Sequence, residues 1–203
     1  MSYAALFPCF YLPPIAAVSE MLKQSDKLWI EKCEHFPKQT YRNRASIYSP
    51  NGKLDLIIPV KKGSNVHTRI KDVRISYESD WQRLHWMSLQ TAYRRSAYFE
   101  FYEDDFRPFF EKQYTFLFDY NLELLTLLLN LLKAGKDFAF TEEYVKSYAN
   151  ISDFRELIHP KKKMESFTVK PYFQVFEPKY GFIPNLSIVD LLFSQGPHSQ
   201  AYL

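Results

Sequence analysis

The segment of residues 44–60, RASIYSPNGKLDLIIPV, constrains the fold of this chain most strongly. Two runs with β-strand character flank Asn51-Gly52, a dipeptide that tolerates the positive φ angles of a tight hairpin turn. In the second run, leucine and isoleucine occupy positions 54, 56 and 58, so one face of that strand should be buried. The pattern predicts an antiparallel hairpin centred on Asn51-Gly52.

The N-terminal part of the chain predicts a second kind of pairing. Residues 3–7 and 27–33 have the apolar character of strands, and 14–25 place apolar residues on one helical face after Pro14. A strand, a helix and a second strand form a βαβ unit, in which the two strands are parallel. Both parallel and antiparallel strands are therefore expected.

From Asp80 onward the apolar period changes to three and four residues. This period predicts a helix over 81–95 with Asp80 as its N-cap, and Pro108 is expected to separate two helical pieces that follow. A third helix is predicted over 119–133. Its leucines cover most of the circumference, so we expect burial on more than one face; exposed leucines there would instead indicate a homo-oligomer interface.

Later segments complete the prediction. Residues 68–77 and 172–176 have strand-like patterns, 158–166 resemble an exposed loop, and a closing helix is expected with Asn185 as its cap. The fold class predicted is α/β, with a mixed sheet built from the N-terminal βαβ unit and the hairpin and covered by helices. Residues 1–203 are expected to form a single domain, because the length suits one core and no boundary divides the chain.

Composition and motifs exclude several classes of function. A formal net charge of +3 does not indicate a nucleic-acid partner. The longest apolar run, 122–132, is much shorter than the roughly 20 residues of a membrane span, and the N-terminus lacks the basic region of a signal peptide, so a cytoplasmic protein is expected. Two distant cysteines, five scattered histidines and five glycines predict no metal site, no disulfide framework and no cofactor loop.

The strongest candidate for a binding site is the segment 35–44, HFPKQTYRNR. Strand alternation would put Arg42 and Arg44 on one face, about 7 Å apart, with Asn43 on the other. Two such guanidiniums can bind phosphate or carboxylate oxygens, and Lys38 and Gln39 could add further donors. The alternative is a solvated strand edge that is kept positive to prevent edge pairing. The residue types alone leave both readings open.

His85 is the candidate catalytic residue. It lies in the middle of the predicted helix over 81–95, one turn after Trp81 and beside Trp86. An imidazole can act as a general base near neutral pH. A packed, hydrogen-bonded helix histidine fits the same position.

Several segments together resemble the WbqC-like protein family. The segment FPKQTYRNR fits the pattern Phe-x-Lys-x-x-aromatic-x-Asn-Arg that we associate with this family. In order along the chain, LIIPV, WQRLHWMSLQTAYRRSAYFEFY, DYNLELL and NLSIVDLLFSQGP resemble further family segments, so the resemblance runs from about residue 3 to 197. Three features differ: no Gln stands beside Pro8, Lys32 and Cys33 occupy the place of an acidic pair that Glu31 and Glu34 flank, and the segment between Gly135 and Met164 is shorter than the family's usual middle region.

The resemblance implies a role in bacterial surface-polysaccharide assembly of the O-antigen type. We expect a transferase that moves an acyl or aminoacyl group to an activated or lipid-linked amino sugar. In this reading Lys38, Gln39, Arg42, Asn43 and Arg44 hold a phosphorylated or carboxylated small-molecule substrate, and His85 accepts the proton of the amine. The alternative is a non-catalytic binding or scaffolding protein of the same pathway, whose many aromatic rings form a contact surface.

Overall fold

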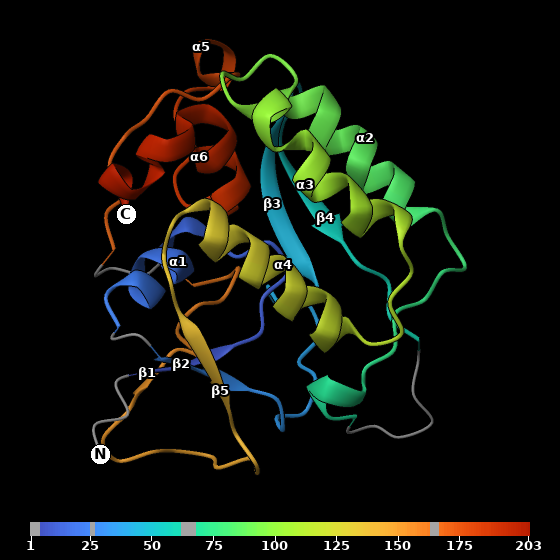
Figure 1. Cartoon of the computed structure of the whole chain (residues 1–203), viewed down its shortest axis with the longest axis vertical. Helices are drawn as coiled ribbons and strands as arrows, with labels where there is room; N and C mark the ends of the chain where they lie inside the picture. Colours follow the sequence, from blue (N-terminus) through green and yellow to red (C-terminus); the bar gives the residue numbers. More distant parts are fainter. Residues whose placement is uncertain (1–4, 25–26, 62–67, 163–166) are drawn as a thin grey trace.

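A computed structural model describes residues 5–24, 27–61, 68–162 and 167–203 (Figure 1). The fold is α/β, as predicted: a four-stranded parallel sheet and a two-stranded antiparallel hairpin pack with helices around one continuous core. In the described part of the chain, the hairpin and the parallel strands form two separate sheets. The first two residues of the predicted strand 3–7, and residues 163–166 of the predicted loop, lie outside the described residues.

The parallel sheet contains β1 (Ala5–Pro8), β2 (Lys27–Glu31), β5 (Asp137–Phe140) and β6 (Ser152–Asp153) in the order β5-β2-β1-β6. Helix α1 (Ile15–Leu22) connects β1 to β2, and these two strands pair in parallel, so the predicted βαβ unit is confirmed. In β2, Leu28 and Ile30 are buried and Trp29, between them, points to the other face and is only partly buried. Leu6 of β1 pairs with Trp29 and shares its face.

The predicted hairpin and its turn at Asn51-Gly52 are confirmed. Leu56 and Ile58 are buried as expected, but Leu54 is 37% exposed, so the prediction of a buried face is wrong at that residue. Strand β3 (Arg44–Ser49) pairs with β4 (Gly52–Ile57) from Arg44 opposite Ile57 to Ser49 opposite Gly52. Gly52 has a φ of +94°, a conformation that most side chains disfavour. The prediction of a strand over 68–77 is wrong: a short 3-10 helix, η1 (Ile70–Asp72), begins this segment, and only isolated bridges follow it.

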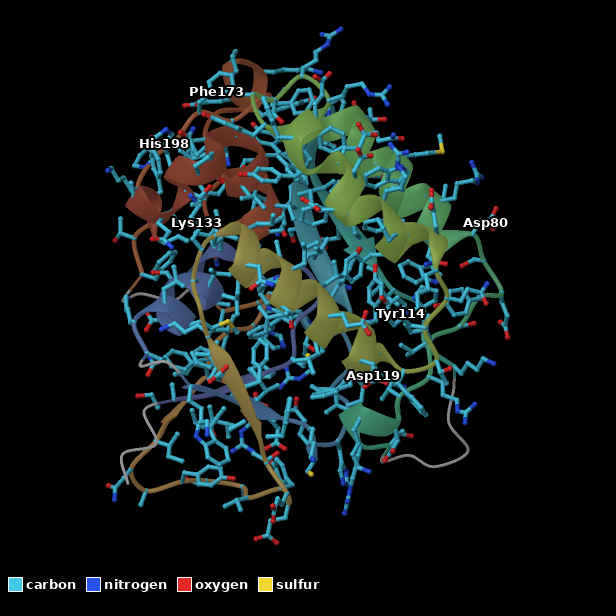
Figure 2. The ribbon with its side chains drawn as sticks, viewed as in Figure 1. Asp80, Tyr114, Asp119, Lys133, Phe173 and His198 are labelled. Atoms are coloured by element: carbon cyan, nitrogen blue, oxygen red, sulfur yellow. The ribbon has the colours of Figure 1, made fainter. Side chains whose placement is uncertain are left out.

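Helices α2 (Trp81–Tyr93), α3 (Phe99–Glu111) and α4 (Leu117–Leu131) follow in the predicted order. Asp80 precedes α2, but its side chain makes no cap bond; it is exposed, points to solvent (Figure 2) and pairs with Arg83 at 3.4 Å. The predicted break at Pro108 is also wrong, because α3 continues through it. Proline removes only the bond to the carbonyl of Asp104, on the exposed side of the helix, where water can replace it.

Helix α4 is buried on more than one face, as its leucine pattern predicts. Leu125, Leu128 and Leu132 are all buried, so these leucines do not form an exposed interface in the monomer. Residues 119, 123, 126 and 130 form the exposed stripe. In the described part of the chain, no helix is long and apolar enough to cross a membrane.

The C-terminal part contains α5 (Glu177–Tyr180), α6 (Ile188–Gln195) and the 3-10 helix η2 (Gly196–Tyr202). The strand predicted over 172–176 is absent from the described structure. The contact of this segment with Ile183 is made by the side chain of Gln174, which bonds both the N–H and the C=O of Ile183. Asn185 does not cap α6; Ser187 does, accepting a bond from Val189 N. Asn185 instead accepts a bond from the N–H of Ala16 at 2.9 Å, in the first turn of α1.

Candidate functional site

The carboxyl ends of the parallel strands place polar side chains at one edge of the sheet. Glu31 is the last residue of β2, Asp153 is the last residue of β6, and Thr141 directly follows β5. Because parallel strands all end at the same edge, residues far apart in sequence meet there. In open parallel sheets this edge is where ligands usually bind.

Arg155 connects these strand ends. Its guanidinium contacts both carboxylate oxygens of Asp153 and the Oε2 atom of Glu31, at 2.9 Å in the latter case. The rings of Tyr144 and Tyr148 lie 5.0 and 5.5 Å from the guanidinium carbon. Arg155 is 4% exposed, so its positive charge is neutralised by fixed partners and not by water.

Glu31 is fully buried, and both of its carboxylate oxygens have partners. Besides the contact with Arg155, its Oε1 atom accepts hydrogen bonds from the hydroxyl of Thr141 at 2.6 Å and from the backbone N–H groups of Cys33 and Glu34. A buried carboxylate is stabilised when donors surround it in this way. Glu31 therefore fixes the start of the loop that leads to the basic segment.

Arg42 of the basic segment belongs to the same cluster. It is 1% exposed and makes a two-pronged contact with Glu34, with Nε–Oε1 and Nη2–Oε2 distances of 2.6 and 2.7 Å. It also donates to the backbone carbonyl of Arg155 at 3.1 Å. Burial raises the pKa of the Glu34 carboxyl, and Arg42 opposes that shift. Three carboxylates and two guanidiniums, all buried or half-buried, form this edge cluster: Glu31, Glu34, Asp153, Arg42 and Arg155.

The other members of the basic segment are placed differently. Lys38 and Gln39 are exposed in the loop between β2 and β3, with Gln39 at a φ of +58°. Asn43 exchanges hydrogen bonds with the backbone of Ile58 and closes the open end of the hairpin. Arg44, the first residue of β3, is partly exposed and faces Asp55, with an Nη1–Oδ2 distance of 3.6 Å.

The predicted alternation of Arg42 and Arg44 on one strand face is therefore not realised. Arg42 lies in the turn before β3, so strand geometry does not apply to it, and its charge is used inside the edge cluster. Arg44 pairs across the hairpin instead. The assignment of these residues to ligand binding stays a prediction.

His85 lies in the aromatic core beneath α2. It is 6% exposed, its Nδ1 atom is 2.9 Å from the hydroxyl of Tyr11, and the ring also bonds the backbone of Ile57. The ring of Trp81 meets it edge-on at 5.1 Å. Burial lowers the pKa of His85 to about 4, with the bond to Ile57 opposing the shift. Such an imidazole is neutral at pH 7, and both its nitrogens are occupied; its role as a general base stays a prediction.

The low pKa of His85 predicts acid sensitivity. In the unfolded chain His85 takes up a proton below a pKa of about 6.5, whereas the folded protein resists it down to about 4. Stability should therefore be unaffected by this group above pH 7 and should fall by about 3 kcal/mol as the pH drops from 7 to 4. Urea unfolding of the wild type and His85→Gln across this range would measure the effect. A difference between the two proteins that does not change with pH would contradict it.

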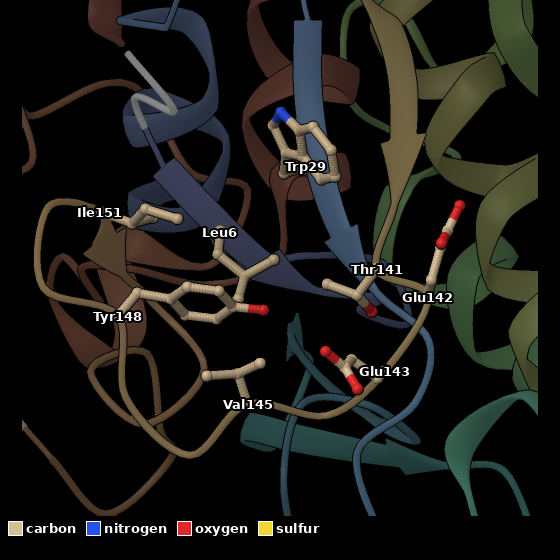
Figure 3. Close-up of a pocket in the computed structure, with 8 residues that line it drawn as sticks. All are labelled: Leu6, Trp29, Thr141, Glu142, Glu143, Val145, Tyr148 and Ile151. Carbon is tan, nitrogen blue, oxygen red and sulfur yellow. The ribbon is translucent and has the colours of Figure 1, made fainter. Parts of the chain in front are cut away.

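A cavity of about 250 Å³ lies on the outer face of the parallel sheet, beneath the segment 141–151 (Figure 3). Trp29 and Leu6 form its sheet side, and the hydroxyl of Tyr148 points across it. Glu142 and Glu143 are exposed at its rim, and in the described part of the chain neither forms an ion pair. The lining consists of Leu6, Trp29, Thr141, Glu142, Glu143, Val145, Tyr148 and Ile151.

The cavity and the edge cluster share two residues. Thr141 lines the cavity and donates to Glu31, and Tyr148 lines the cavity and covers the guanidinium of Arg155. Burial raises the pKa of Tyr148, and the charge of Glu31 adds to that effect while Arg155 opposes it. The phenol is therefore a hydrogen-bond donor at neutral pH. The edge cluster holds these two walls of the cavity in place.

The side chains that commonly bind metal ions are spread apart in the described part of the chain. Within the residues that the structure describes, no three His, Cys, Asp or Glu side chains come together in a group that could hold a metal ion. Cys9 and Cys33 are both buried thiols, and burial raises the pKa of Cys9 far above its ordinary value. The polar groups available to a ligand in the cavity are hydroxyls and carboxylates.

The sequence of this chain matches the model of a known protein family. The model of the WbqC-like protein family matches residues 10–166, which is more than half of the chain. The chain belongs to this family. The match covers the edge cluster, the basic segment and every cavity-lining residue except Leu6; the C-terminal segment that resembles the family's ending lies outside it.

One curated relative shows similarity along almost the whole length. The uncharacterized protein Rv1507c of Mycobacterium tuberculosis (strain ATCC 25618 / H37Rv) is 25% identical over 221 residues, covering 95% of this chain and 91% of that protein. No solved structure shows significant similarity to this chain.

Sequence patterns in this WbqC-like chain identified only part of the site. The basic segment led to Arg42, but Asp153 and Arg155 were not identified, because β6 has only two residues and no apolar period. Thr141 and Tyr148 were not identified, because no strand was predicted at β5. One signal was available: Glu31 is an acidic residue near the end of the predicted parallel strand 27–33. Ligand-binding residues are common at that position.

Proposed function

We propose that this WbqC-like protein is a transferase of bacterial surface-polysaccharide assembly, which moves an acyl or aminoacyl group to the amine of an activated or lipid-linked amino sugar. The observation that carries the proposal is the cavity on the outer face of the parallel sheet, with an indole wall, a phenol and two carboxylates that form no ion pair with any described residue. The resemblance to proteins of polysaccharide genes supports the pathway.

The chemistry of the cavity suits one amino-sugar ring. The flat face of Trp29 can pack against the C–H groups of a sugar, while carboxylates accept hydrogen bonds from its hydroxyls and attract its ammonium group. Tyr148 can donate to a ring or hydroxyl oxygen. The volume of about 250 Å³ lies just below the roughly 300–1000 Å³ typical of small-molecule sites, so a single ring fits better than a whole nucleotide sugar.

The transfer step needs a base and an activated acyl donor. In the proposed reaction the sugar ammonium first gives a proton to Glu142 or Glu143, and the neutral amine then attacks the acyl carbonyl. A C–N bond forms, the bond from the acyl carbon to its ester or thioester oxygen or sulfur breaks, and the leaving group takes a proton. Holding the amine near the carbonyl supplies much of the rate gain.

The basic segment has a supporting part in this proposal. Lys38 is exposed in the loop that leaves the carboxyl end of β2, so it can reach an anionic donor near the same edge. Arg42 and Asn43 hold the loop through Glu34 and Ile58. A direct part for His85 would require it to leave its contacts with Tyr11 and Ile57.

Ligand-observed NMR titration with D-glucosamine and N-acetyl-D-glucosamine tests the cavity. Glucosamine should bind more tightly than its acetylated form, because only its ammonium can pair with Glu142 and Glu143. The double change Glu142→Gln and Glu143→Gln should weaken glucosamine binding about tenfold, the equivalent of about 1.4 kcal/mol. Asp104→Asn with Asp105→Asn, an adjacent exposed acidic pair on α3, serves as the matched control. Equal binding by wild type and both double variants would refute the cavity as the acceptor site.

The alternative of a binding or scaffolding protein depends on exposed aromatic rings. Most of the described rings are buried or packed against the core, while Phe101, Tyr144, Phe173 and Tyr180 are the described ones that are strongly exposed. A core that uses so many rings accounts for the aromatic composition without a contact surface. This observation supports the transferase over the scaffold.

A further inference from the structure

A second concave region lies at the other end of the molecule from the sheet cavity. It is a groove of about 480 Å³ between the end of α2, the turn of the hairpin and the segment before α5. In Figure 1, α5 lies at the top of the long axis and β1, β2 and β5 lie at the bottom. A ligand in this groove therefore has no contact with the sheet cavity.

Two adjacent arginines line the groove. Arg94 and Arg95 directly follow α2, and both are exposed. In the described part of the chain neither has an ion pair with a carboxylate, although five other arginines do: Arg42, Arg44, Arg83, Arg107 and Arg155. An exposed guanidinium without an acidic partner keeps its bidentate donors for an anion.

The surroundings of these arginines add polar and apolar contacts. Thr91 and Gln90 also line the groove, and the amide of Gln90 donates a hydrogen bond to Glu103 at 3.1 Å. Met87, 49% exposed, and Phe176 form apolar walls.

Charges of both signs border the groove. Lys179 donates to the carbonyl of Pro50, which lines the groove, and Glu177 follows Phe176 directly. Cations at a helix C-terminus are favourable by themselves, since they face the free carbonyls. The attraction to free carbonyls accounts for Arg94 and Arg95 at the end of α2. It does not account for the hydroxyl residue and the apolar walls in the same groove.

We propose that this groove is a binding site for a phosphate-bearing ligand. Arg94 and Arg95 bind the phosphate or diphosphate oxygens, Thr91 adds a hydroxyl donor, and the carrier of the phosphate packs against Met87 and Phe176. The carrier can be a nucleoside or an isoprenoid, because both present an apolar face beside a diphosphate. The site is independent of the acceptor cavity and of the transfer proposed there.

Isothermal titration of the full chain with three probes tests the site: inorganic pyrophosphate, uridine diphosphate and geranyl diphosphate. At least one of the two carriers should bind ten times or more tightly than pyrophosphate, and the tighter one identifies the carrier class. The double change Arg94→Gln and Arg95→Gln should weaken binding of that probe at least tenfold. Arg83→Gln, on the same helix outside the groove lining, should leave it unchanged.

The Arg83, Arg94 and Arg95 variants should remain folded, because all three side chains are exposed and substitutions at exposed positions usually change stability little. Glucosamine binding in the sheet cavity should survive the arginine changes and weaken about tenfold in the Glu142→Gln and Glu143→Gln variant, so the two sites are separable. If all three diphosphates bind the wild type no better than the double arginine variant, the proposal is wrong. If pyrophosphate binds as tightly as uridine diphosphate and geranyl diphosphate, the proposed packing of the carrier against Met87 and Phe176 is wrong.

Discussion

Replacing Arg42 with methionine should lower the free energy of unfolding by about 3–5 kcal/mol, because it leaves a buried carboxylate without its cation. Glu34 is 5% exposed and has both oxygens on the Arg42 guanidinium. The carbonyl of Arg155 would lose a donor as well. Urea unfolding followed by circular dichroism at pH 7 would measure the change.

The matched control is Arg44→Met, two positions along the same basic segment. Arg44 is partly exposed and meets Asp55 at 3.6 Å, so water can replace the lost contact and the cost should be below about 1 kcal/mol. The defect of Arg42→Met should shrink toward pH 4, because Glu34 can then take up a proton and become neutral. The added change Glu34→Gln should likewise recover part of the stability. Equal costs at the two arginines would contradict the buried pair.

Replacing Asp190 with alanine should cost about 3–5 kcal/mol, because it leaves several buried donors without an acceptor. Asp190 is 1% exposed and accepts hydrogen bonds from Tyr93 at 2.8 Å, from Tyr172 at 2.6 Å and from Gln174 at 2.9 Å. The hydroxyl of Tyr93 also accepts from the backbone N–H of Tyr48, so the network joins α2, α6 and the hairpin. Thermal and urea unfolding would report the loss.

Asp190→Asn should be milder than Asp190→Ala, since its amide oxygen can still accept while its volume fills the site. Asp104→Ala, on the exposed side of α3, should change stability by no more than about 0.5 kcal/mol. A small effect of Asp190→Ala would show that the two tyrosines and Gln174 find other partners. The network would then be dispensable for the fold.

Local sequence patterns were sufficient for most of the secondary structure. The hairpin follows from Asn51-Gly52 and the alternation after it, and α2 and α4 follow from apolar residues at helical spacing. These patterns can be read locally, because each depends only on residues within about one helical turn or one pair of adjacent strands. Asp80 occupies the predicted N-cap position of α2 without a side-chain cap bond, and the cap assigned to Asn185 was wrong. A polar side chain can also turn to solvent or to another helix, as Asn185 does toward α1.

The two arginines of the basic segment show what the sequence alone determined. Their residue types established that both carry a positive charge and can form two-pronged contacts with oxygen anions. Nothing within the segment indicates which of its cations, Arg42, Arg44 or Lys38, is buried and which is exposed. The sequence also placed Glu31 inside the predicted strand 27–33 of a βαβ unit, and the structure ends that strand at Glu31.

Only the tertiary structure decided which charges are buried. Arg42 is buried because Glu34 and the backbone of Arg155, 113 positions away, come to it at the edge of the sheet. Arg155 is buried because β6 pairs with β1 and brings Asp153 and Arg155 to the end of β2. Burying a charge is favourable only when opposite charges and donors meet it in fixed geometry, and those partners are assembled by strand order, which no local pattern contains.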